Sequence, residues 1–208
     1  MRFQKSRGGC GACGGSGESR LARPRARFAI AGFRNQVDRY IYLTPTTQIA
    51  QGLPVFVTTQ ADAVLWGGEV SADVDVAHPL TLGGRADLVR GENRTRGQPL
   101  PLMPPSRAAL EAEWRLGRRR WAEGAYLTLT VERTVRQSRL APLDLPTGGY
   151  TLLHLSTGLV TTWAARVVRV DLRVRNATDV TYRDFLSRYK TFADAPGRSV
   201  VLRVAAGL

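Results

Sequence analysis

The sequence predicts an all-β protein: a portion of an antiparallel up-and-down transmembrane β-barrel with about eight long strands. Three observations support this prediction. Polarity alternates with a period of two residues, the segments between turn signals are long, and the connections between them alternate between short and long. A helical membrane protein is excluded, because no apolar run approaches the roughly 20 residues that a helical span requires.

The alternation is clearest in RVVRVDLRV, residues 166–174. Its inner arginines and its aspartate share one parity, and valine or leucine occupies the other. Side chains of a strand alternate between two faces, so one face is apolar and the other charged. A soluble antiparallel sheet can show the same pattern, with its apolar face toward a core. Strand length favours a membrane, where the apolar face contacts lipid and the charged face lines a wet lumen.

We expect strands at 25–43, 54–77, 79–92, 105–117, 119–136, 148–159, 162–176 and 196–208. Each reaches the length of about 9 to 11 residues that crosses a bilayer at a slant, whereas strands of soluble proteins centre on about 5 to 6. The junctions at 78–79, 117–118 and 160–161 are short and are expected on the periplasmic side. The connections 44–53, 93–104, 137–147 and 177–195 are longer, rich in Pro, Gly, Asn and Thr, and expected on the extracellular side.

Seven of the eight expected strands have their own sequence support. The first ends in the aromatic run RYIY, and EVSADVDV in the second alternates strictly. LTLGGRADL gives the third strand the same period. The fourth contains most of LEAEWRLGRRR, residues 110–120, which has a helix-forming composition, but its alternation and the preceding prolines favour a strand. The last three strands include YTLLHLSTGL, RVVRVDLRV and SVVLRVAAGL.

The charge is distributed unevenly. The chain has 30 Lys and Arg against 17 Asp and Glu, a net charge of +13. Residues 1–27 hold seven basic side chains and one acid, and so contribute +6. We therefore divide the chain into a basic, Gly-rich leader at 1–24, expected to be disordered, and a barrel portion at 25–208. No export signal is visible in the leader.

We assign no catalytic, cofactor-binding or metal-binding residue, and the ligand-binding residues stay unknown. Cys10 and Cys13 form a C-x-x-C pair that lacks both the further ligands of a zinc site and the strand and helix of a redox site. His78 falls at a turn, and His154 lies between two leucines with no evident partner, so an enzyme is not expected. Nucleic acid is not expected either, because the arginines alternate with acids instead of clustering with aromatic residues.

Four stretches carry a resemblance to one family. GGYTLLHLSTGL followed by VRVDLRVRNATDVTYRDFLSRYKTFADAPGRSVVLRVAAGL resembles the C-terminal end of TonB-dependent outer-membrane receptors. QADAVLWGGEVSADV and VRGENRTRGQPLPLMPPSRAAL resemble an upstream strand and a loop between two strands. AGFRNQVDRYIYLTPT is similar to a receptor strand that ends at the outer rim. The stretches lie in family order and are distributed over residues 26–208.

The resemblance implies a bacterial outer-membrane receptor for energy-dependent uptake of a ferric siderophore or another bulky nutrient such as cobalamin. It implies outer-membrane lipid and the barrel assembly machinery as partners, and no cofactor. The resemblance implies that a complete receptor has a 22-strand barrel and an N-terminal plug that contacts TonB. Neither the plug nor the earlier strands are recognisable in this chain. We therefore expect a C-terminal barrel fragment that does not transport alone. The alternative is a small stand-alone barrel, acting as a pore or a binding protein.

Several residues suit structural roles. Gly67 and Gly68 suit a point where the barrel curves, and Pro104 and Pro105 precede a strand, where a missing N–H costs least. Leu208 shares its parity with the lipid-facing residues of the last strand. Side-chain to backbone hydrogen bonds are expected in the last loop from Asn176, Asp179 and Asp184. Aromatic residues near strand ends could form an interfacial girdle or pack locally, and these are Tyr40, Tyr42, Phe56, Trp66, Trp121, Tyr150, Trp163 and Tyr182.

Overall fold

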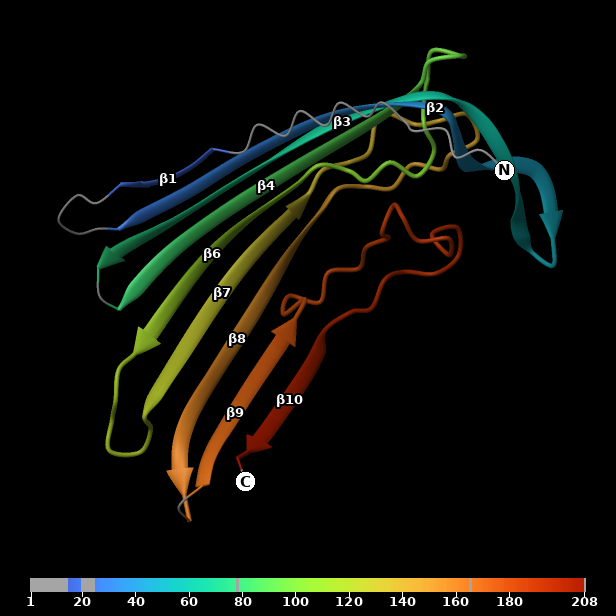
Figure 1. The fold of residues 1–208 in the computed structure, drawn as a ribbon. Coiled ribbons are helices and arrows are strands. Elements are labelled where there is room, and N and C mark those ends of the chain that lie inside the picture. Colours follow the sequence, from blue (N-terminus) through green and yellow to red (C-terminus); the bar gives the residue numbers. More distant parts are fainter. Residues whose placement is uncertain (1–14, 20–24, 78, 165, 208) are drawn as a thin grey trace.

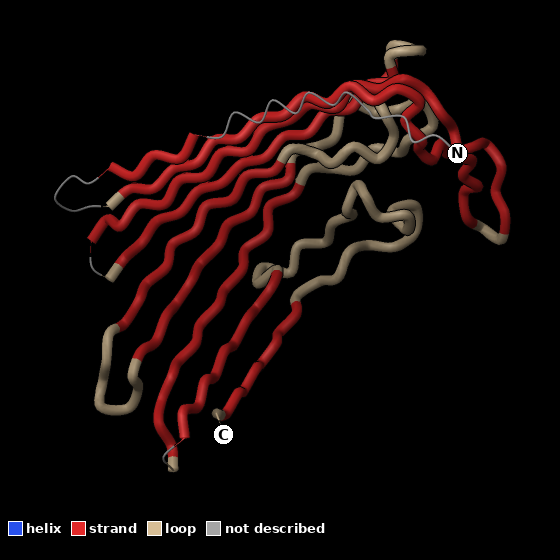
Figure 2. The backbone as a smooth tube through the Cα atoms, viewed as in Figure 1, coloured by secondary structure: helices blue, strands red, loops and turns tan. Residues whose placement is uncertain are grey.

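The computed structural model describes residues 15–19, 25–77, 79–164 and 166–207. The regular secondary structure in this part of the chain is all strand, so the predicted all-β fold is confirmed (Figures 1 and 2). No helix in the described residues is long and apolar enough to cross a bilayer.

The strands form one antiparallel sheet. They are β1 (Gly15–Ser19), β2 (Ala26–Ala50), β3 (Leu53–Ala77), β4 (Leu80–Asn93), β5 (Gln98–Pro99), β6 (Arg107–Leu116), β7 (Gly124–Thr134), β8 (Tyr150–Trp163), β9 (Arg166–Arg175) and β10 (Ser199–Ala206). Their order is β1-β2-β3-β4-β6-β7-β8-β9-β10, with β5 paired to β4. With the short β5 left aside, each strand lies beside its neighbours in the sequence, which is the predicted up-and-down order. The sheet is open, with β1 and β10 at its two ends (Figure 1).

The eight predicted strands correspond to β2, β3, β4, β6, β7, β8, β9 and β10. The short strand β1 falls inside the leader that we expected to be disordered. It pairs with the start of β2, from Gly15 opposite Ile30 to Ser19 opposite Ala26. Backbone pairing needs no side-chain pattern, so polarity could not signal it. The rest of the leader, with Cys10 and Cys13, lies outside the described residues.

The prediction of a long loop at 44–53 is wrong. β2 continues to Ala50 and β3 begins at Leu53, so only Gln51 and Gly52 form the turn. Both have positive φ, 52° and 80°, as a two-residue hairpin turn of type I′ requires. The Pro-Thr sequence read as a loop signal lies at a register shift between Pro45 and Ile49, where a proline is tolerated within a strand.

Two of the three expected short turns are also misplaced. The connection after β6 covers 117–123 and is closed by a bridge between Arg119 and Ala122, so it is not a tight turn at 117–118. β8 continues through 160–161 to Trp163, and the reversal follows at Ala164, which has φ 49°. The Thr-rich sequence there pairs with β9 as ordinary strand, because threonine suits a pleated sheet. His78, in the third expected turn, lies outside the described residues, as does Leu208.

The other three long connections are confirmed. We call them the first long loop (94–106), the second long loop (135–149) and the third long loop (176–198). All three lie at the same end of the sheet, which we call the loop end, and they fold together there (Figure 2). The opposite end of the sheet, with the connections after β3, β6 and β8, is the turn end.

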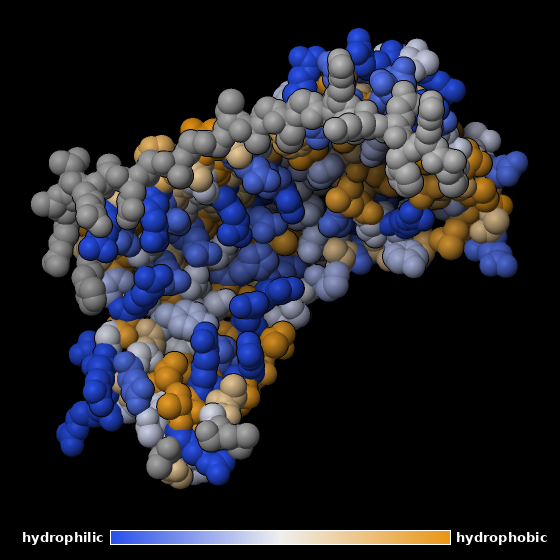
Figure 3. Space-filling model, viewed as in Figure 1, coloured by the Kyte–Doolittle hydropathy of each residue, from blue (hydrophilic) through white to orange (hydrophobic). Residues whose placement is uncertain are grey.

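The two faces of the sheet differ as predicted. Cross-strand register places Asp73 opposite Gly83, Gly83 opposite Glu111 and Glu111 opposite Thr130, so these residues share one face. This face is concave, and hydrophilic residues fill the middle of the sheet face seen in Figure 3. The opposite face, which we call the outer face, exposes large apolar side chains, among them Phe28, Ile30, Val70, Leu82, Leu110, Leu127, Leu172, Val200, Leu202 and Val204.

Gly67, expected at a point where the barrel curves, lies under an aromatic ring. It pairs with Phe33, whose ring covers it, and a Cβ built at Gly67 would lie 2.7 Å from Cε1 of that ring. The same Cβ would lie 2.5 Å from the carbonyl oxygen of Leu88. A side chain at this position would therefore displace both the aromatic ring and the neighbouring strand.

The β2–β3 hairpin bends at its loop end (Figure 1). A register shift between Val37 and Tyr40 leaves Arg39 with φ 53°. The carboxylate of Asp62 accepts a hydrogen bond from the Arg39 backbone N–H at 2.9 Å, and the Gln60 side chain donates to the Arg39 carbonyl at 3.1 Å. A β-bulge fixed by side chains therefore sets the bend.

Candidate functional site

The concave face and the three long loops above it form the candidate site. A hollow of about 760 Å³ lies against β6, β7, β8 and β9 and reaches the third long loop. Acids line it from β6 and β7, arginines line it from β4 and β9, and threonine, serine and histidine lie among them. Its charged lining residues are Arg85, Glu111, Glu113, Glu132, Arg173 and Arg175.

The charged residues of the hollow lie in strips along the strands. Glu111 and Glu113 lie on β6 and Glu132 lies on β7, so the carboxylates come from neighbouring strands. Arg85 lies on β4, on one side of these acids, and Arg173 and Arg175 lie on β9, on the other side across the intervening β8. A concave surface on which acids lie between arginines can hold a partner or solute whose charges are arranged in the opposite sense.

A polar cluster lies nearer the turn end of the concave face. The hydroxyl of Tyr126 donates to Oδ1 of Asp171 at 2.9 Å, and Nε of Arg169 donates to Oδ2 of the same carboxylate at 2.9 Å. Gly158 lies directly opposite both Tyr126 and Asp171 in the register. A Cβ at Gly158 would lie 2.5 Å from the Tyr126 ring, so the absent side chain makes the space that the ring occupies.

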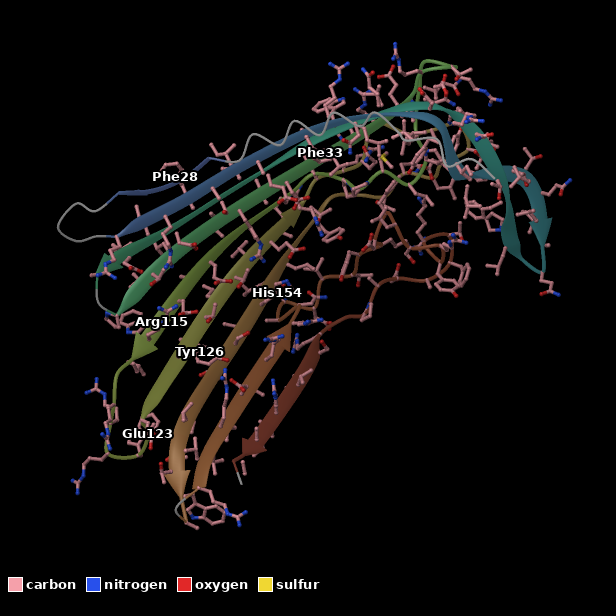
Figure 4. All side chains as sticks on the ribbon, viewed as in Figure 1. Phe28, Phe33, Arg115, Glu123, Tyr126 and His154 are labelled. Atoms are coloured by element: carbon pink, nitrogen blue, oxygen red, sulfur yellow. The ribbon has the colours of Figure 1, made fainter. Side chains whose placement is uncertain are left out.

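His154, for which the sequence showed no catalytic partner, lies on the concave face and contacts the start of the third long loop. His154 lines the hollow, and its Nδ1 accepts a hydrogen bond from the Asn176 backbone N–H at 3.3 Å. Thr130 lies opposite it on β7. Figure 4 labels His154, Tyr126 and Arg115, which share the concave face by register. The leucines beside His154 in sequence point to the opposite face, because strand side chains alternate.

The expected hydrogen bonds in the third long loop are confirmed. Asn176 has φ 49°; its amide oxygen accepts from Val180 N–H, and its amide nitrogen donates to the Val180 carbonyl, both at 2.9 Å. The Asp179 carboxylate accepts from Arg198 N–H at 2.7 Å, and that of Asp184 accepts from Leu186 N–H at 2.8 Å. These contacts fix both ends of the loop.

A buried ion pair joins the second and third long loops. Nζ of Lys190 lies 3.5 Å from Oδ1 of Asp144, and the two side chains are 8% and 5% exposed. Nζ also donates to the Phe185 carbonyl at 3.0 Å and lies 3.8 Å from the centre of the Phe185 ring. Burial lowers the pKa of Lys190, and the charge of Asp144 opposes that shift in part.

The same aspartate reaches the first long loop. Oδ2 of Asp144 accepts a hydrogen bond from the Leu102 backbone N–H at 3.0 Å. The side-chain nitrogen of Gln137, a buried residue, donates to the Met103 carbonyl at 2.8 Å. Asp144 therefore contacts both of the other long loops through its two oxygens, and we call the Asp144, Lys190 and Leu102 contacts the loop clasp.

The strand-end aromatic residues divide between the two roles considered for them. The tyrosines pack locally: Tyr40 stacks with Tyr42 at 6.2 Å, and Tyr150 packs on Tyr182 at 4.2 Å between ring centres. Burial is the main cause that raises the pKa of Tyr182, with Asp184 and Glu132 adding to it. Trp163 at the end of β8 and Trp121 in the connection after β6 stay exposed, which leaves them available for a girdle. Trp66 is exposed too, but it lies in the middle of β3 and not near a strand end as expected.

Sequence reasoning missed the loop clasp. Lys190 drew attention as part of a family-like motif, but Asp144 lies in an irregular segment 46 residues away, and no periodicity links the two. No metal site emerges either: within the described part of the chain, no group of three or more His, Cys, Asp or Glu side chains is placed to hold a metal ion.

Comparison with known proteins gives a consistent result. A family model described as TonB-dependent receptor-like β-barrel matches residues 19–177. No curated protein matches the chain. Among solved structures, the fold is similar to that of the copper transporter OprC, with a TM-score of 0.70 and 17% identity over 90% of this chain. It is also similar to BauA, the ferric preacinetobactin receptor from Acinetobacter baumannii, with a TM-score of 0.62 and 19% identity over 91% of this chain. The matches span 29% and 28% of those two proteins.

Proposed function

The chain belongs to the family of TonB-dependent receptor-like β-barrels, and we propose that it forms part of the wall of an outer-membrane receptor that takes up a ferric siderophore or a similarly bulky nutrient. Proteins of this family are transporters, not enzymes, and reside in the bacterial outer membrane. The separation of an apolar outer face from a charged concave face is the observation that carries this proposal. In lipid, that arrangement lets each side chain meet a suitable environment.

The class of ligand is supported by the two similar structures, since one is a copper transporter and the other a ferric siderophore receptor. A metal ion or a metal chelate is therefore the first class to test. The three long loops and the concave hollow would contact it, and we propose the hollow lined by Glu132, His154 and Arg175 as its path along the wall. TonB and the barrel assembly machinery are the further partners that we propose from family membership.

We also propose that residues 1–208 do not transport alone. The described sheet is open, and β10 is paired on one side only, with β9. An unpaired edge is very costly in lipid, because no water is available to its backbone groups. Further strands, from the same or another chain, would remove that cost and complete a channel.

Membrane extraction tests the proposed location. The chain is produced behind an export signal, outer membranes are isolated and washed with urea, and the retained protein is run on a gel with and without boiling. Retention without a heat-dependent shift supports a wall portion that needs more strands. Retention with a faster unboiled band supports the stand-alone barrel, whereas removal by urea contradicts a membrane-embedded sheet.

TonB-dependent ligand uptake by cells that produce only residues 1–208 would contradict the proposal that the chain cannot transport alone. The uptake of a radiolabelled ferric siderophore and of copper ions is compared in cells with and without TonB. We expect no difference between the two strains for either probe.

A further inference from the structure

The apolar outer face ends toward the loop end in a charged row. Outer-face positions of β3 from Gly68 to Val76 are uncharged, and the next outer-face residue toward the loops is Trp66. On β4, the uncharged outer-face positions end at Leu88, and the next one is Arg90. The edge of the apolar surface therefore coincides with a tryptophan and an arginine on adjacent strands.

Cross-strand register makes this edge a continuous site. Arg34 of β2 lies opposite Trp66 of β3, and Trp66 lies opposite Arg90 of β4. Side chains directly opposite in an antiparallel pair have Cβ atoms about 4.5 to 5.5 Å apart. Beside this row is a hollow of about 500 Å³, lined by Arg34, Val64, Trp66, Glu92 and Arg94. Trp66 is 41% exposed, so its ring is available to a ligand.

The charge of this site is positive. Arg34, Arg90 and Arg94 meet one acid, Glu92, and none of the three guanidinium groups lies within 4.0 Å of a carboxylate among the residues that the structure describes. The ion pairs found in those residues involve other arginines and Lys190. A guanidinium fork binds phosphate oxygens in pairs, so unneutralised arginines on one surface are suited to a phosphate group.

We propose that this site, which we call the outer arginine site, binds the phosphate of a phosphorylated lipid headgroup in the membrane. Such a lipid satisfies both parts of the surface: its phosphate meets the arginines, and its acyl chains continue along the apolar outer face below them. Trp66 lies at the boundary, where amphipathic rings prefer the headgroup layer. Basic residues close to anionic lipids add to binding in this way. The proposal rests on the membrane location proposed above.

A binding comparison in micelles tests it. The full chain is folded in zwitterionic detergent, immobilised, and washed with micelles that contain bisphosphorylated lipid A, and the retained lipid is quantified by mass spectrometry. The Arg34→Gln/Arg90→Gln variant should bind about 30-fold more weakly, from about fivefold per arginine near an anionic lipid surface. Arg34→Lys/Arg90→Lys keeps the charge and should lose less than about fivefold.

The matched control removes two arginines from the other face. Arg27 and Arg203 lie on the concave face, opposite Asp73 and Asp171, and the Arg27→Gln/Arg203→Gln variant changes the net charge equally. It should bind lipid A like the wild type. Equal loss in both double variants overturns the proposal, as does equal retention of dephosphorylated lipid A. Displacement by millimolar inorganic phosphate would assign the site to free phosphate and also overturns it.

Cross-linking in isolated outer membranes gives a second measurement that needs no refolding. A benzophenone amino acid is placed at position 88, on the outer face beside Arg90, or at position 89, on the concave face. We expect a cross-link to phosphorylated lipid from position 88 only. Protein that resists urea extraction but gives no such cross-link refutes the lipid site alone, whereas protein lost to urea refutes the membrane location.

Discussion

Removing either charge of the ion pair between Asp144 and Lys190 should release the long loops that the loop clasp joins. Asp144→Asn preserves an acceptor for the Leu102 N–H but leaves the ammonium group of Lys190 buried without a counter-ion. Lys190→Met leaves the carboxylate unpaired instead. Removing one partner of a buried ion pair costs about 3 to 5 kcal/mol, because an uncompensated charge stays buried. The side-chain exposures of 8% and 5% place this pair in the buried class.

The double variant Asp144→Asn/Lys190→Met should be far less damaging than the sum of the two single changes. It removes both charges, and Met fills most of the space of the lysine stem while Asn keeps the contact to Leu102. Neutral replacements of a buried pair are often tolerated. We expect a coupling of at least about 2 kcal/mol between the two sites, at the upper end of values for contacting residues.

Hydrogen exchange measures the effect of each substitution on the separate loops, since amide protection reports the free energy of opening each segment. The Leu102 amide, which donates to Asp144, and the Ala195 amide, which donates to the Tyr182 carbonyl, report on the first and third long loops. Each single variant should speed exchange in all three long loops and leave β7 and β8 unchanged. Additive effects of the two substitutions, or faster exchange in only one loop, would refute the clasp.

The pH dependence of the same loops has a defined sign. Burial lowers the pKa of folded Lys190 below its ordinary value of 10.5, so between the folded pKa and 10.5 the unfolded chain binds more protons. Stability from this group therefore rises with pH across that window. The pKa of Tyr182 is raised above 10.0, so the stability contributed by this group falls as the pH rises above 10.0. The difference between the wild type and Lys190→Met in the pH dependence of loop hydrogen exchange isolates the rise in stability due to Lys190. A difference that stays constant between pH 8 and 10.5 contradicts this prediction.

Three further predictions test local geometry. Gly158→Ala places a Cβ 2.5 Å from the Tyr126 ring and should cost about 1 to 3 kcal/mol in urea unfolding, whereas Gly148→Ala, with nothing within 4 Å, should be near neutral. Gly52→Ala, at φ 80°, should cost about 1 kcal/mol in the same assay, and an unchanged midpoint would contradict the hairpin turn. Asn176→Ala loses two hydrogen bonds to Val180 and should speed hydrogen exchange in the third long loop, while protection as in the wild type would refute that role.

Strand existence could be predicted from the sequence, because a charged lumen and an apolar membrane impose a two-residue period that no turn interrupts. The ends of the strands could not be predicted in the same way. The segment TPTTQIAQGLP contains the turn residues that usually mark a loop, yet it is strand up to Ala50 and again from Leu53. Register shifts absorb its proline, and such shifts depend on the partner strand, which local sequence does not describe.

The candidate site was less predictable than the fold, for a related reason. His154 was judged by its sequence neighbours, but its actual neighbours are Thr130 across the register and the backbone of Asn176 at the start of a loop. Asn176 itself was predicted well, because its hydrogen bonds reach only four residues along the chain. Local side-chain to backbone contacts leave a sequence signal, and contacts between distant loops leave none.

The loop contacts form a closed circuit, which bears on how ligand specificity could arise. The first long loop is tied to the β2–β3 hairpin, since the Asp62 carbonyl accepts from Arg94 N–H at 2.8 Å. The clasp then joins the first, second and third long loops. The third returns to the hairpin, where the guanidinium carbon of Arg188 lies 5.4 Å from the centre of the Phe56 ring. Under the function proposed above, a ligand that contacts one loop would meet a surface whose shape depends on all four elements, and exchanging a single loop between receptors should disturb the others before it transfers specificity.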